Sequence, residues 1–412
     1  MKEIVVIGGG AAGLMAAGMA AQQGARVKLL EKKDRVGSKL RITGKGRCNI
    51  TADVDMDTLI KGIPGNGRFL YSPFHEFSNN DLIKFFNKHG LKTKVERGNR
   101  VFPESDKAQD VVDLLVDYAR KSGVEIQTSI TVLGIRINDG QITGVETRSG
   151  NMRADAVIIA TGGMSYPGTG STGDGYSWAR AIGHNIVELR PGLVPLVVEE
   201  SWIKDLQGLS LKNVTAAAYT AEGKKINGDF GELLFTHFGL SGPIILSMSR
   251  DIGDYMYRRK QAVKIKLDLK PALNEEKLDE RLLRDFDKYS RKQFKNALND
   301  LLPQKLISVF INLSGVDPDK PCHQISRTER LEIVRLLKNF TLTIIGTRPI
   351  TEAIVTAGGV NIKEVNPKTM ESKLVKGLYF AGEVLDVDGY TGGYNLQAAF
   401  STGYVAGKYA GI

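Results

Sequence analysis

Three glycines near the N-terminus have the spacing of a phosphate-binding turn. Gly8, Gly10 and Gly13 follow a short apolar run (KEIVVI) and precede a run of small residues. In such a turn the first glycine reverses the chain, the second lets backbone approach a pyrophosphate, and the next helix directs its N-terminal N–H groups at the anion. Glu31 ends the second apolar run (ARVKLLE), where a carboxylate accepts hydrogen bonds from an adenosine ribose. The spacing therefore predicts a dinucleotide site.

The same glycine pattern recurs at Gly168, Gly170 and Gly173, in different surroundings. It follows Ser-Tyr-Pro instead of a strand, and no strand ending in an acid comes about 20 residues later. We interpret this segment as a loop and not as a second dinucleotide site. Because no separate nicotinamide domain is then present, a bound flavin fits the N-terminal site better than NAD.

The elements that must position these residues are those of a doubly wound sheet. Strand, helix and strand follow one another within residues 2–31, and ADAVIIA at 154–160 has the pattern of another central strand. Helical patterns cover 80–90 and 107–122, and a hairpin is expected at Asp139-Gly140. The first part of the chain is thus expected to form a Rossmann-like α/β domain.

The spacing of apolar residues changes twice before the glycine-rich pattern of the N-terminal region returns. Alternating apolar runs indicate an antiparallel β subdomain, helical spacing with mixed charge follows it, and glycine-rich segments reappear near residue 347. The sequence predicts a discontinuous Rossmann-like FAD-binding domain with two inserts. The boundaries are 1–193 for its first part, 194–273 for the β-rich insert, 274–346 for the helical insert and 347–412 for its second part.

Composition restricts the class of protein. The 412 residues are 42% hydrophobic and 25% charged, as in a folded globular chain. Cys48 and Cys322 are too few and too far apart for a disulfide framework or a C-x-x-C pair. No apolar run reaches the about 18 residues of a spanning helix, and the five histidines share no ligand spacing. We expect a cytoplasmic protein with no membrane partner and no metal.

Positive charge exceeds negative charge, and the formal net charge is +10. Residues 32–47 include seven basic side chains and one acid, which would neutralise a diphosphate. The inserts contain two groups of basic side chains, which either bind a polyanion or form a solvated surface. The first group is Arg258, Arg259, Lys260, Lys264 and Lys266. The second group is Lys288, Arg291, Lys292 and Lys295, and its spacing is that of one helix face.

Longer motifs carry a specific resemblance over essentially the whole chain. GKGRCNIT at 44–51, ELLFTHFGLSGP at 232–243 and GYTGGYNLQ at 389–397 closely resemble the BaiN/YhiN-like family of flavoproteins. ATGG at 160–163 and GLYFAGE at 377–383 resemble, more broadly, FAD enzymes of the glutathione-reductase and fumarate-reductase type. The sequence departs from the family pattern at one position. Many members have three consecutive glycines before the arginine, and here Lys45 replaces the middle glycine.

The resemblance implies a role for each matching residue. Glu31 would hold the adenosine ribose beside the backbone of Ile130, and Glu383 would meet the ribityl and pyrophosphate region. The helix that begins near Asn395 would turn its positive end to the flavin, which stabilises the reduced form. The residues expected to bind FAD are Gly8, Gly10, Ala12, Gly13, Glu31, Lys32, Arg47, Ile130, Thr161, Gly162, Gly382, Glu383, Gly393, Asn395 and Leu396.

Cys48 is the reactive side chain in the glycine-rich segment that runs alongside the flavin in proteins of this class. A cysteine there can protonate a substrate carbon as a general acid, or act as a redox partner. Alternatively, Cys48 has no chemical role and is only a small residue that packs near the cofactor. Cys48 is therefore a candidate catalytic residue, and both interpretations stay open.

The resemblance implies an FAD-dependent oxidoreductase with NAD(P)H as its transient electron donor. Members of such a family have been connected with reduction of a uridine double bond in ribosomal RNA, with reductive steps on steroid-like bile acids and with amine oxidation. The basic inserts favour RNA, because an RNA-binding protein needs charge along many phosphates. We expect C=C reduction of a ribosomal RNA uridine, to dihydrouridine. The alternatives are reduction of a small hydrophobic or steroid-like substrate, and flavin amine oxidation.

Overall fold

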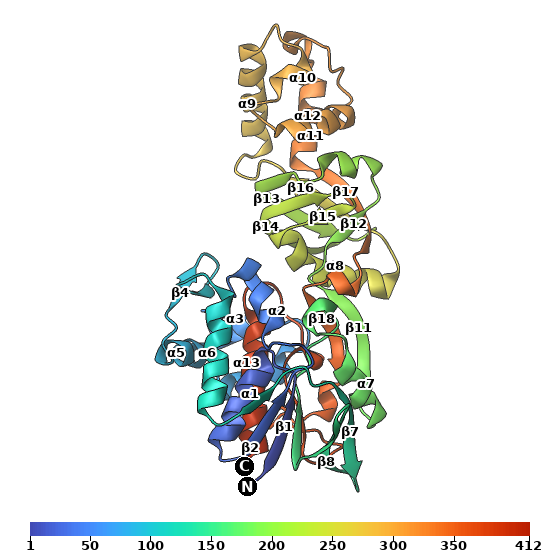
Figure 1. Cartoon of the computed structure of the whole chain (residues 1–412). Helices are drawn as coiled ribbons and strands as arrows, with labels where there is room; N and C mark the ends of the chain where they lie inside the picture. The colour runs from blue at the N-terminus through green and yellow to red at the C-terminus, as the bar shows by residue number, and fades with distance from the viewer. The chain divides into compact units, whose positions relative to one another are not determined.

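The computed structural model describes all 412 residues and divides into two compact units (Figure 1). The first unit comprises residues 1–192 and 350–412, and the second comprises residues 193–349. Each unit has its own cluster of buried apolar side chains. The predicted fold class is confirmed, since an α/β domain of Rossmann type is interrupted by antiparallel strands and helices. None of the helices combines the length and apolarity needed to cross a bilayer.

A parallel sheet of five strands forms the centre of the first unit. Its central strand β1 pairs with β10 on one side and with β2 on the other. Strands β1 and β10 are buried almost throughout, as expected for a parallel sheet covered on two faces. In spatial order the strands are β19 (Leu378–Phe380), β10 (Ala156–Ile159), β1 (Glu3–Ile7), β2 (Arg26–Leu30) and β6 (Glu125–Gln127).

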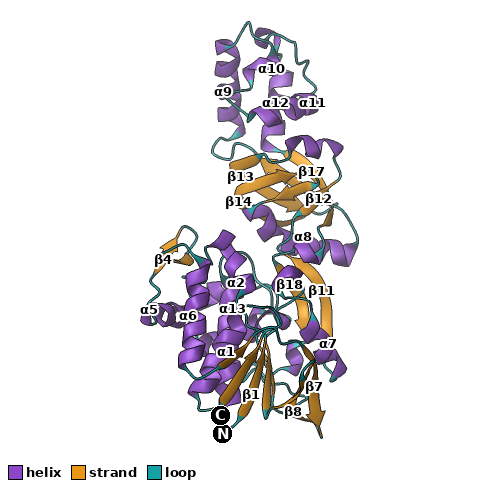
Figure 2. Cartoon of the chain, in the orientation of Figure 1, coloured by secondary structure: helices purple, strands orange, loops and turns teal.

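Three helices pack side by side against this sheet (Figure 2). They are α1 (Ala11–Gln22), α6 (Ala108–Lys121) and α13 (Tyr394–Gly411). Small residues bring α1 and α13 together, because a Cβ at Gly403 or Gly407 would lie only 2.4 or 2.2 Å from a carbonyl oxygen of α1. The two ends of the chain therefore build one helical layer over the strand that carries the glycine turn.

Shorter elements complete the first unit. The predicted helices at 80–90 and 107–122 correspond to α5 and α6, and the predicted hairpin joins β7 to β8 with positive φ at Asp139 and Gly140. The bounds are α2 (Ser38–Ile42), β3 (Thr51–Ala52), α3 (Met56–Lys61), α4 (Tyr71–Glu76), α5 (Asn79–Lys88), β4 (Thr93–Glu96), β5 (Arg100–Pro103), β7 (Val132–Asn138), β8 (Gln141–Thr147), β9 (Gly150–Arg153), α7 (Asp174–Ala181), β11 (Ile186–Gly192) and β18 (Val355–Val360).

The second unit contains a closed six-stranded barrel, with the helices of residues 275–338 gathered at one end (Figure 1). The last strand of the barrel, β17, follows the helices in sequence and closes it by pairing with β12 and β16. In spatial order the strands are β12 (Leu196–Val198), β15 (Gly239–Ser241), β14 (Lys225–Thr236), β13 (Ser210–Tyr219), β16 (Val263–Asp268) and β17 (Phe340–Thr347). The helices are α8 (Pro243–Arg259), α9 (Glu275–Lys288), α10 (Phe294–Ala297), α11 (Gln304–Ser314) and α12 (Arg327–Lys338).

The expected basic helix face between Lys288 and Lys295 is not formed, so this prediction is wrong. Helix α9 ends at Lys288, and a turn separates it from α10. The reason is burial, because Phe294 and Ala297 return the chain to the apolar core. Two of the four cations are also paired, Lys288 with Asp300 at 3.0 Å and Lys295 with Asp319 at 2.6 Å.

Candidate cofactor-binding site

The glycine turn connects β1 directly to α1. Gly8 has a φ of 105°, and a Cβ there would lie 2.5 Å from the carbonyl oxygen of Ala160. A Cβ at Gly13 would lie 1.8 Å from the carbonyl oxygen of Gly8, so both positions require glycine. At Gly10 an added Cβ would meet nothing within 4 Å. Since Gly10 caps α1 without a side-chain hydrogen bond, the free N–H groups of the first turn are available to an anion.

Glu31 lies against this turn and is held by backbone amides. Its carboxylate accepts hydrogen bonds from the N–H groups of Gly9 and Lys33, both at 2.9 Å. The N–H of Ile130 donates to the carbonyl oxygen of Glu31 at 3.0 Å. The structure thus brings together the turn, the acid and the backbone segment that were expected at the adenosine end of a dinucleotide.

The second glycine motif lies in a loop, as predicted, and this loop reaches the same region. A Cβ at Gly170 would be 3.7 Å from a carboxylate oxygen of Glu31. Lys32, an expected cofactor residue, forms an ion pair with Asp174 at 2.6 Å and also donates to Thr172. Residues 168–174 therefore border the first site, and the Lys32 charge is partly compensated by a protein carboxylate.

Glu383 is the centre of a polar cluster. Its carboxylate accepts hydrogen bonds from the Lys39 amino group at 2.6 Å, the Thr356 N–H at 2.8 Å and the Ser165 hydroxyl at 3.1 Å. Lys39 also donates to Ser165 at 2.7 Å. Ser165 and Thr356 are fully buried, so the cluster ties together helix α2 at Lys39, the loop of Ser165 and strand β18 at Thr356, which come from distant parts of the chain. Gly162 is adjacent, because a Cβ there would be 4.0 Å from Glu383 Oε2.

Two buried side-chain oxygen atoms of the first unit have no hydrogen-bond partner. They are the hydroxyl of Thr161, which follows β10, and the Oδ1 atom of Asn49 in the GKGRCNIT segment. A buried polar atom without a partner marks a place where a ligand or water supplies one. The N-terminus of α1 at Gly10 and the Thr161 hydroxyl can donate hydrogen bonds to a pyrophosphate, and the Glu31 carboxylate and Asn49 Oδ1 can accept them, so this set of donors and acceptors fits the pyrophosphate and ribose of FAD.

The C-terminal motif is held against the start of the chain. Gly382 has a φ of 78°, and a Cβ there would be 2.9 Å from the Ala12 side chain. A Cβ at Gly393 would lie 2.4 Å from backbone of Thr51, so the start of α13 lies against β3. Asn395, in the first turn of α13, binds the loop that precedes the helix: its side chain accepts from the Gly389 N–H and donates to the Gly389 carbonyl, both at 2.8 Å. Asn395 thus holds the loop that precedes α13, and the next residue of the helix, Leu396, is partly buried.

The guanidinium of Arg47 is bound by protein side chains, and 34% of the Arg47 side chain is exposed. Its guanidinium binds Asp106 at 2.8 Å, contacts Glu96 and stacks over the Phe102 ring with its Cζ atom 4.2 Å from the centroid. The hydrogen bonds with Glu96 and Asp106 raise the pKa of Arg47, and Arg47 lowers the pKa of Glu96. Arg47 thus fastens the glycine-rich segment to β4, β5 and the turn after β5, and its expected contact with the diphosphate stays a prediction.

Cys48 is completely buried and belongs to the apolar core of the first unit. A residue that touches cofactor or substrate has exposed surface when the ligand is absent, and Cys48 has none. Burial raises the pKa of the Cys48 thiol to about 12, although a hydrogen bond with Thr43 opposes this shift. Of the two interpretations, the structure favours packing over proton transfer.

This burial predicts the reactivity of Cys48. With a pKa near 12, only about one thiol in 10⁴ is ionised at pH 8. Iodoacetamide at pH 8 should therefore label neither Cys48 nor the buried Cys322 in the native protein, and both after unfolding in urea. Mass spectrometry of the peptides measures the labelling. Rapid labelling of native Cys48 that FAD suppresses would instead place the thiol at the cofactor.

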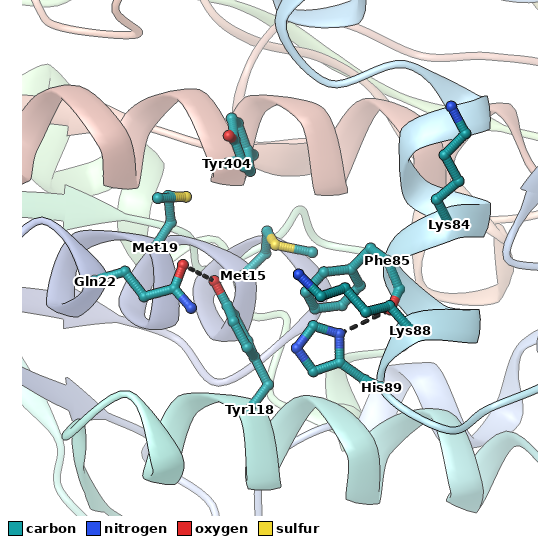
Figure 3. Close-up of a pocket in the computed structure, with 9 residues that line it drawn as sticks. All are labelled: Met15, Met19, Gln22, Lys84, Phe85, Lys88, His89, Tyr118 and Tyr404. Atoms are coloured by element: carbon teal, nitrogen blue, oxygen red, sulfur yellow. Dashed lines mark hydrogen bonds between the residues drawn. The ribbon is translucent and has the colours of Figure 1, made fainter.

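A separate cavity of about 300 Å³ lies among helices α1, α5, α6 and α13 (Figure 3). Its lining combines thioether and aromatic side chains with the polar groups of Gln22, Lys84 and Lys88. The rings of Phe85 and Tyr118 meet edge to face, with their centroids 4.9 Å apart. None of the residues expected to bind FAD lines this cavity. No group of three or more histidine, cysteine or acidic side chains in the chain could hold a metal ion.

Lys39, Ser165 and Thr356 were not identified from the sequence as members of the site. Lys39 was counted only as one basic residue among seven, and isolated hydroxyl residues carry no spacing signal. Their partner Glu383 comes from a different part of the chain, so nothing local indicates the cluster. The sequence also did not indicate that Asn49 Oδ1 would be buried without a hydrogen-bond partner, although Asn49 lies in the GKGRCNIT motif.

The chain is similar over its full length to characterised proteins. A family model described as the HI0933-like protein Rossmann domain matches residues 2–409. A 3-dehydro-bile acid delta(4,6)-reductase of Clostridium scindens is 34% identical over 100% of this chain and 99% of its own. A ribosomal RNA dihydrouridine synthase of Escherichia coli is 32% identical over 98% of this chain and 97% of its own.

Solved structures support the fold. A 3-ketosteroid-delta4-(5alpha)-dehydrogenase of Rhodococcus jostii aligns with a TM-score of 0.54 and 16% identity, and the alignment covers 100% of this chain and 97% of that one. At this identity the likeness concerns architecture alone.

Proposed function

The chain belongs to the HI0933-like protein family, and from this premise we propose that it uses NAD(P)H to reduce a carbon–carbon double bond of a uridine in ribosomal RNA. The family resemblance of the motifs is confirmed, and with it the prediction of an FAD-dependent oxidoreductase. The electron donor and the substrate are the parts that we propose.

The proposal of C=C reduction is supported mainly by the two relatives that match this chain over its full length. One is named for reducing double bonds of a bile acid, and the other is named for making dihydrouridine, which is uridine with two hydrogens added. When bound, FAD supplies the redox step, in which hydride from NAD(P)H reaches one carbon of the double bond, a proton adds to its neighbour and NAD(P)⁺ leaves.

The chain's own residues have simpler tasks. The N-terminus of α1 and Glu31 would bind the pyrophosphate and the adenosine ribose. Glu383 holds Lys39 of α2, the loop of Ser165 and Thr356 of β18 through its three hydrogen bonds. The N-terminus of α13 would stabilise negative charge on the reduced cofactor.

Unpaired positive charge in the second unit supports RNA as the substrate. Lys264 and Lys266 project from β16, are exposed and have no carboxylate within ion-pair distance. A reductase of a hydrophobic acid needs one or two cations beside its substrate, whereas an RNA needs charge along its phosphates. Ribosomal RNA and NAD(P)H would both place the reaction in the cytoplasm.

Deleting the gene should remove dihydrouridine from one defined position of ribosomal RNA, because no other activity would then reduce that uridine. Chemical mapping of dihydrouridine in purified ribosomal RNA measures the loss. Expression of the wild-type chain from a plasmid should restore the modification. An unchanged dihydrouridine map in the deletion strain would contradict the RNA substrate.

Reduction of a small steroid-like substrate is the second candidate, favoured by the 34% identity with the bile acid reductase over the whole chain. The two candidates separate in one assay. The protein is reduced anaerobically with NAD(P)H, and reoxidation of the cofactor is followed after adding either ribosomal RNA from the deletion strain or a 3-keto-4-ene steroid. Fast reoxidation by the steroid alone would favour this second candidate.

A further inference from the structure

The outer surface of the barrel in the second unit carries an unusual set of side chains. On β16, Val263, Ile265 and Leu267 are buried inside the barrel, and the alternating residues Lys264 and Lys266 are exposed. The neighbouring strand β13 alternates in the same way and turns Tyr219 and Ala217 outward. Alternation in paired strands collects these side chains on one face.

The strand register places them in two adjacent rows. Tyr219 is paired with Lys225 of β14 on one side and with Lys264 of β16 on the other. In the next row Ala217 lies between Gly228 and Lys266. We call this group of Lys225, Tyr219, Lys264, Gly228, Ala217 and Lys266 the barrel face.

The lysines of the barrel face are not neutralised by the protein. None of the three has a carboxylate within ion-pair distance. The acids at its border are engaged elsewhere, since Asp268 pairs with Lys338 at 2.6 Å and Glu200 accepts from the Thr343 N–H at 2.9 Å. An uncompensated group of cations on a rigid sheet attracts a polyanion.

An aromatic ring lies within this charge. The Lys266 amino group is 5.0 Å from the centroid of the Tyr219 ring, so the ring has a cation on one side. Ala217 has a small side chain and Gly228 has none, and the Lys225 amino group lies over Gly228, since a Cβ there would be 3.3 Å from its Nζ atom. Proteins that bind single-stranded nucleic acid combine cations for the phosphates with aromatic rings on which bases stack.

We propose that the barrel face binds a single-stranded segment of the RNA substrate, with a base against Tyr219 and phosphates at Lys225, Lys264 and Lys266. The proposal rests on the proposed function and extends it by assigning the RNA-binding surface. A small-molecule reductase has no use for three unpaired lysines around an outward ring.

The test measures binding of a fluorescent single-stranded RNA 12-mer by the full-length FAD-loaded protein, using anisotropy at several salt concentrations. The triple variant Lys225→Ala, Lys264→Ala, Lys266→Ala should lower the slope of log affinity against log salt by about 2, at about 0.7 per phosphate contact. Tyr219→Ala should weaken binding roughly 5- to 150-fold, and Tyr219→Phe should bind like the wild type because it retains the ring.

A second triple variant is the matched control. Lys277→Ala, Arg284→Ala, Arg327→Ala removes the same charge from exposed positions on α9 and α12 and should keep the salt slope within about one unit of the wild type. FAD content and the melting temperature are checked for every variant, since each should fold normally.

Equal losses in both triple variants would overturn the barrel face as the binding site. Failure of the proposed function itself is seen separately, as an unchanged dihydrouridine map in the deletion strain. If the map changes and Tyr219→Ala binds RNA like the wild type, the stacking role is wrong and the reaction assignment is unaffected.

Discussion

Replacing Gly13 with alanine is expected to prevent the protein from folding into an FAD-loaded form. The new methyl group would lie 1.8 Å from the carbonyl oxygen of Gly8, which belongs to the backbone and cannot rotate away as a flexible side chain could. Helix α1 cannot move away easily, because a Cβ at Gly403 of α13 would already lie only 2.4 Å from the Ala12 carbonyl. The overlap should cost several kcal/mol, out of the about 5–15 kcal/mol that stabilise a typical protein. Flavin content and circular dichroism melting measure the effect.

Gly10→Ala is the matched control for this experiment. At Gly10 the φ angle is −85°, which alanine tolerates, and the added Cβ meets nothing within 4 Å. Loss of a glycine cap should change stability by only about 1 kcal/mol. The methyl group would project into the space expected for the pyrophosphate, so FAD affinity should fall while the fold persists. Normal FAD content and melting in Gly13→Ala would show that the turn has a different geometry.

Glu383→Gln is expected to weaken FAD binding while most of the fold survives. The substitution removes the charge that holds Lys39 at 2.6 Å and weakens the hydrogen bonds from Thr356 and Ser165. Hydrogen bonds to a charged group contribute about 1.5–3 kcal/mol each when buried. The side chains of Lys39 and Glu383 are 24% and 20% exposed, so solvent reduces the ion-pair part of this value. FAD titration into the apoprotein should show roughly a 10- to 100-fold weaker affinity.

A double-mutant cycle with Lys39→Met tests the ion pair itself. If the two side chains act together, the double variant should lose less affinity than the two single losses combined, with a coupling of about 0.5–3 kcal/mol. Glu76→Gln serves as the control, because it breaks the Lys408–Glu76 pair in the same unit without touching an expected cofactor residue. Additive losses, or equal FAD affinity in Glu383→Gln and Glu76→Gln, would contradict the role of Glu383.

Several features of this protein could be predicted from the sequence because they are local. The β1 strand, the turn of Gly8 to Gly13 and helix α1 follow from a short apolar run, from glycine spacing and from small residues that pack closely. The hairpin at Asp139-Gly140 follows from two residues that tolerate positive φ. In each case the signal and the structure occupy the same few residues. The family motifs then identified the flavoprotein class, because they are long runs of specific residues.

Other features depend on contacts between distant residues. Arg47 was expected at the diphosphate, and the structure pairs it with Glu96 at the end of β4 and with Asp106 in the turn after β5. Cys48 looked reactive, and packing buried it. The basic helix face was lost at Tyr289, where the need to bury Phe294 outweighed a continuous helical pattern. Charge and periodicity indicate which structures and contacts a segment is able to form. Which of them it does form depends on how it is buried against the rest of the chain.

The site and the barrel face are the clearest cases of this division. By itself the sequence determined that Glu31 follows a glycine turn and that basic residues occur in the insert. Only parallel pairing of β1, β10 and β19 brought Thr161 and Glu383 to that turn, and only the register of β13 with β14 and β16 placed Tyr219 between two lysines. Strand pairing joins residues hundreds of positions apart, and its energy comes from apolar area buried over the whole unit, which no local spacing records.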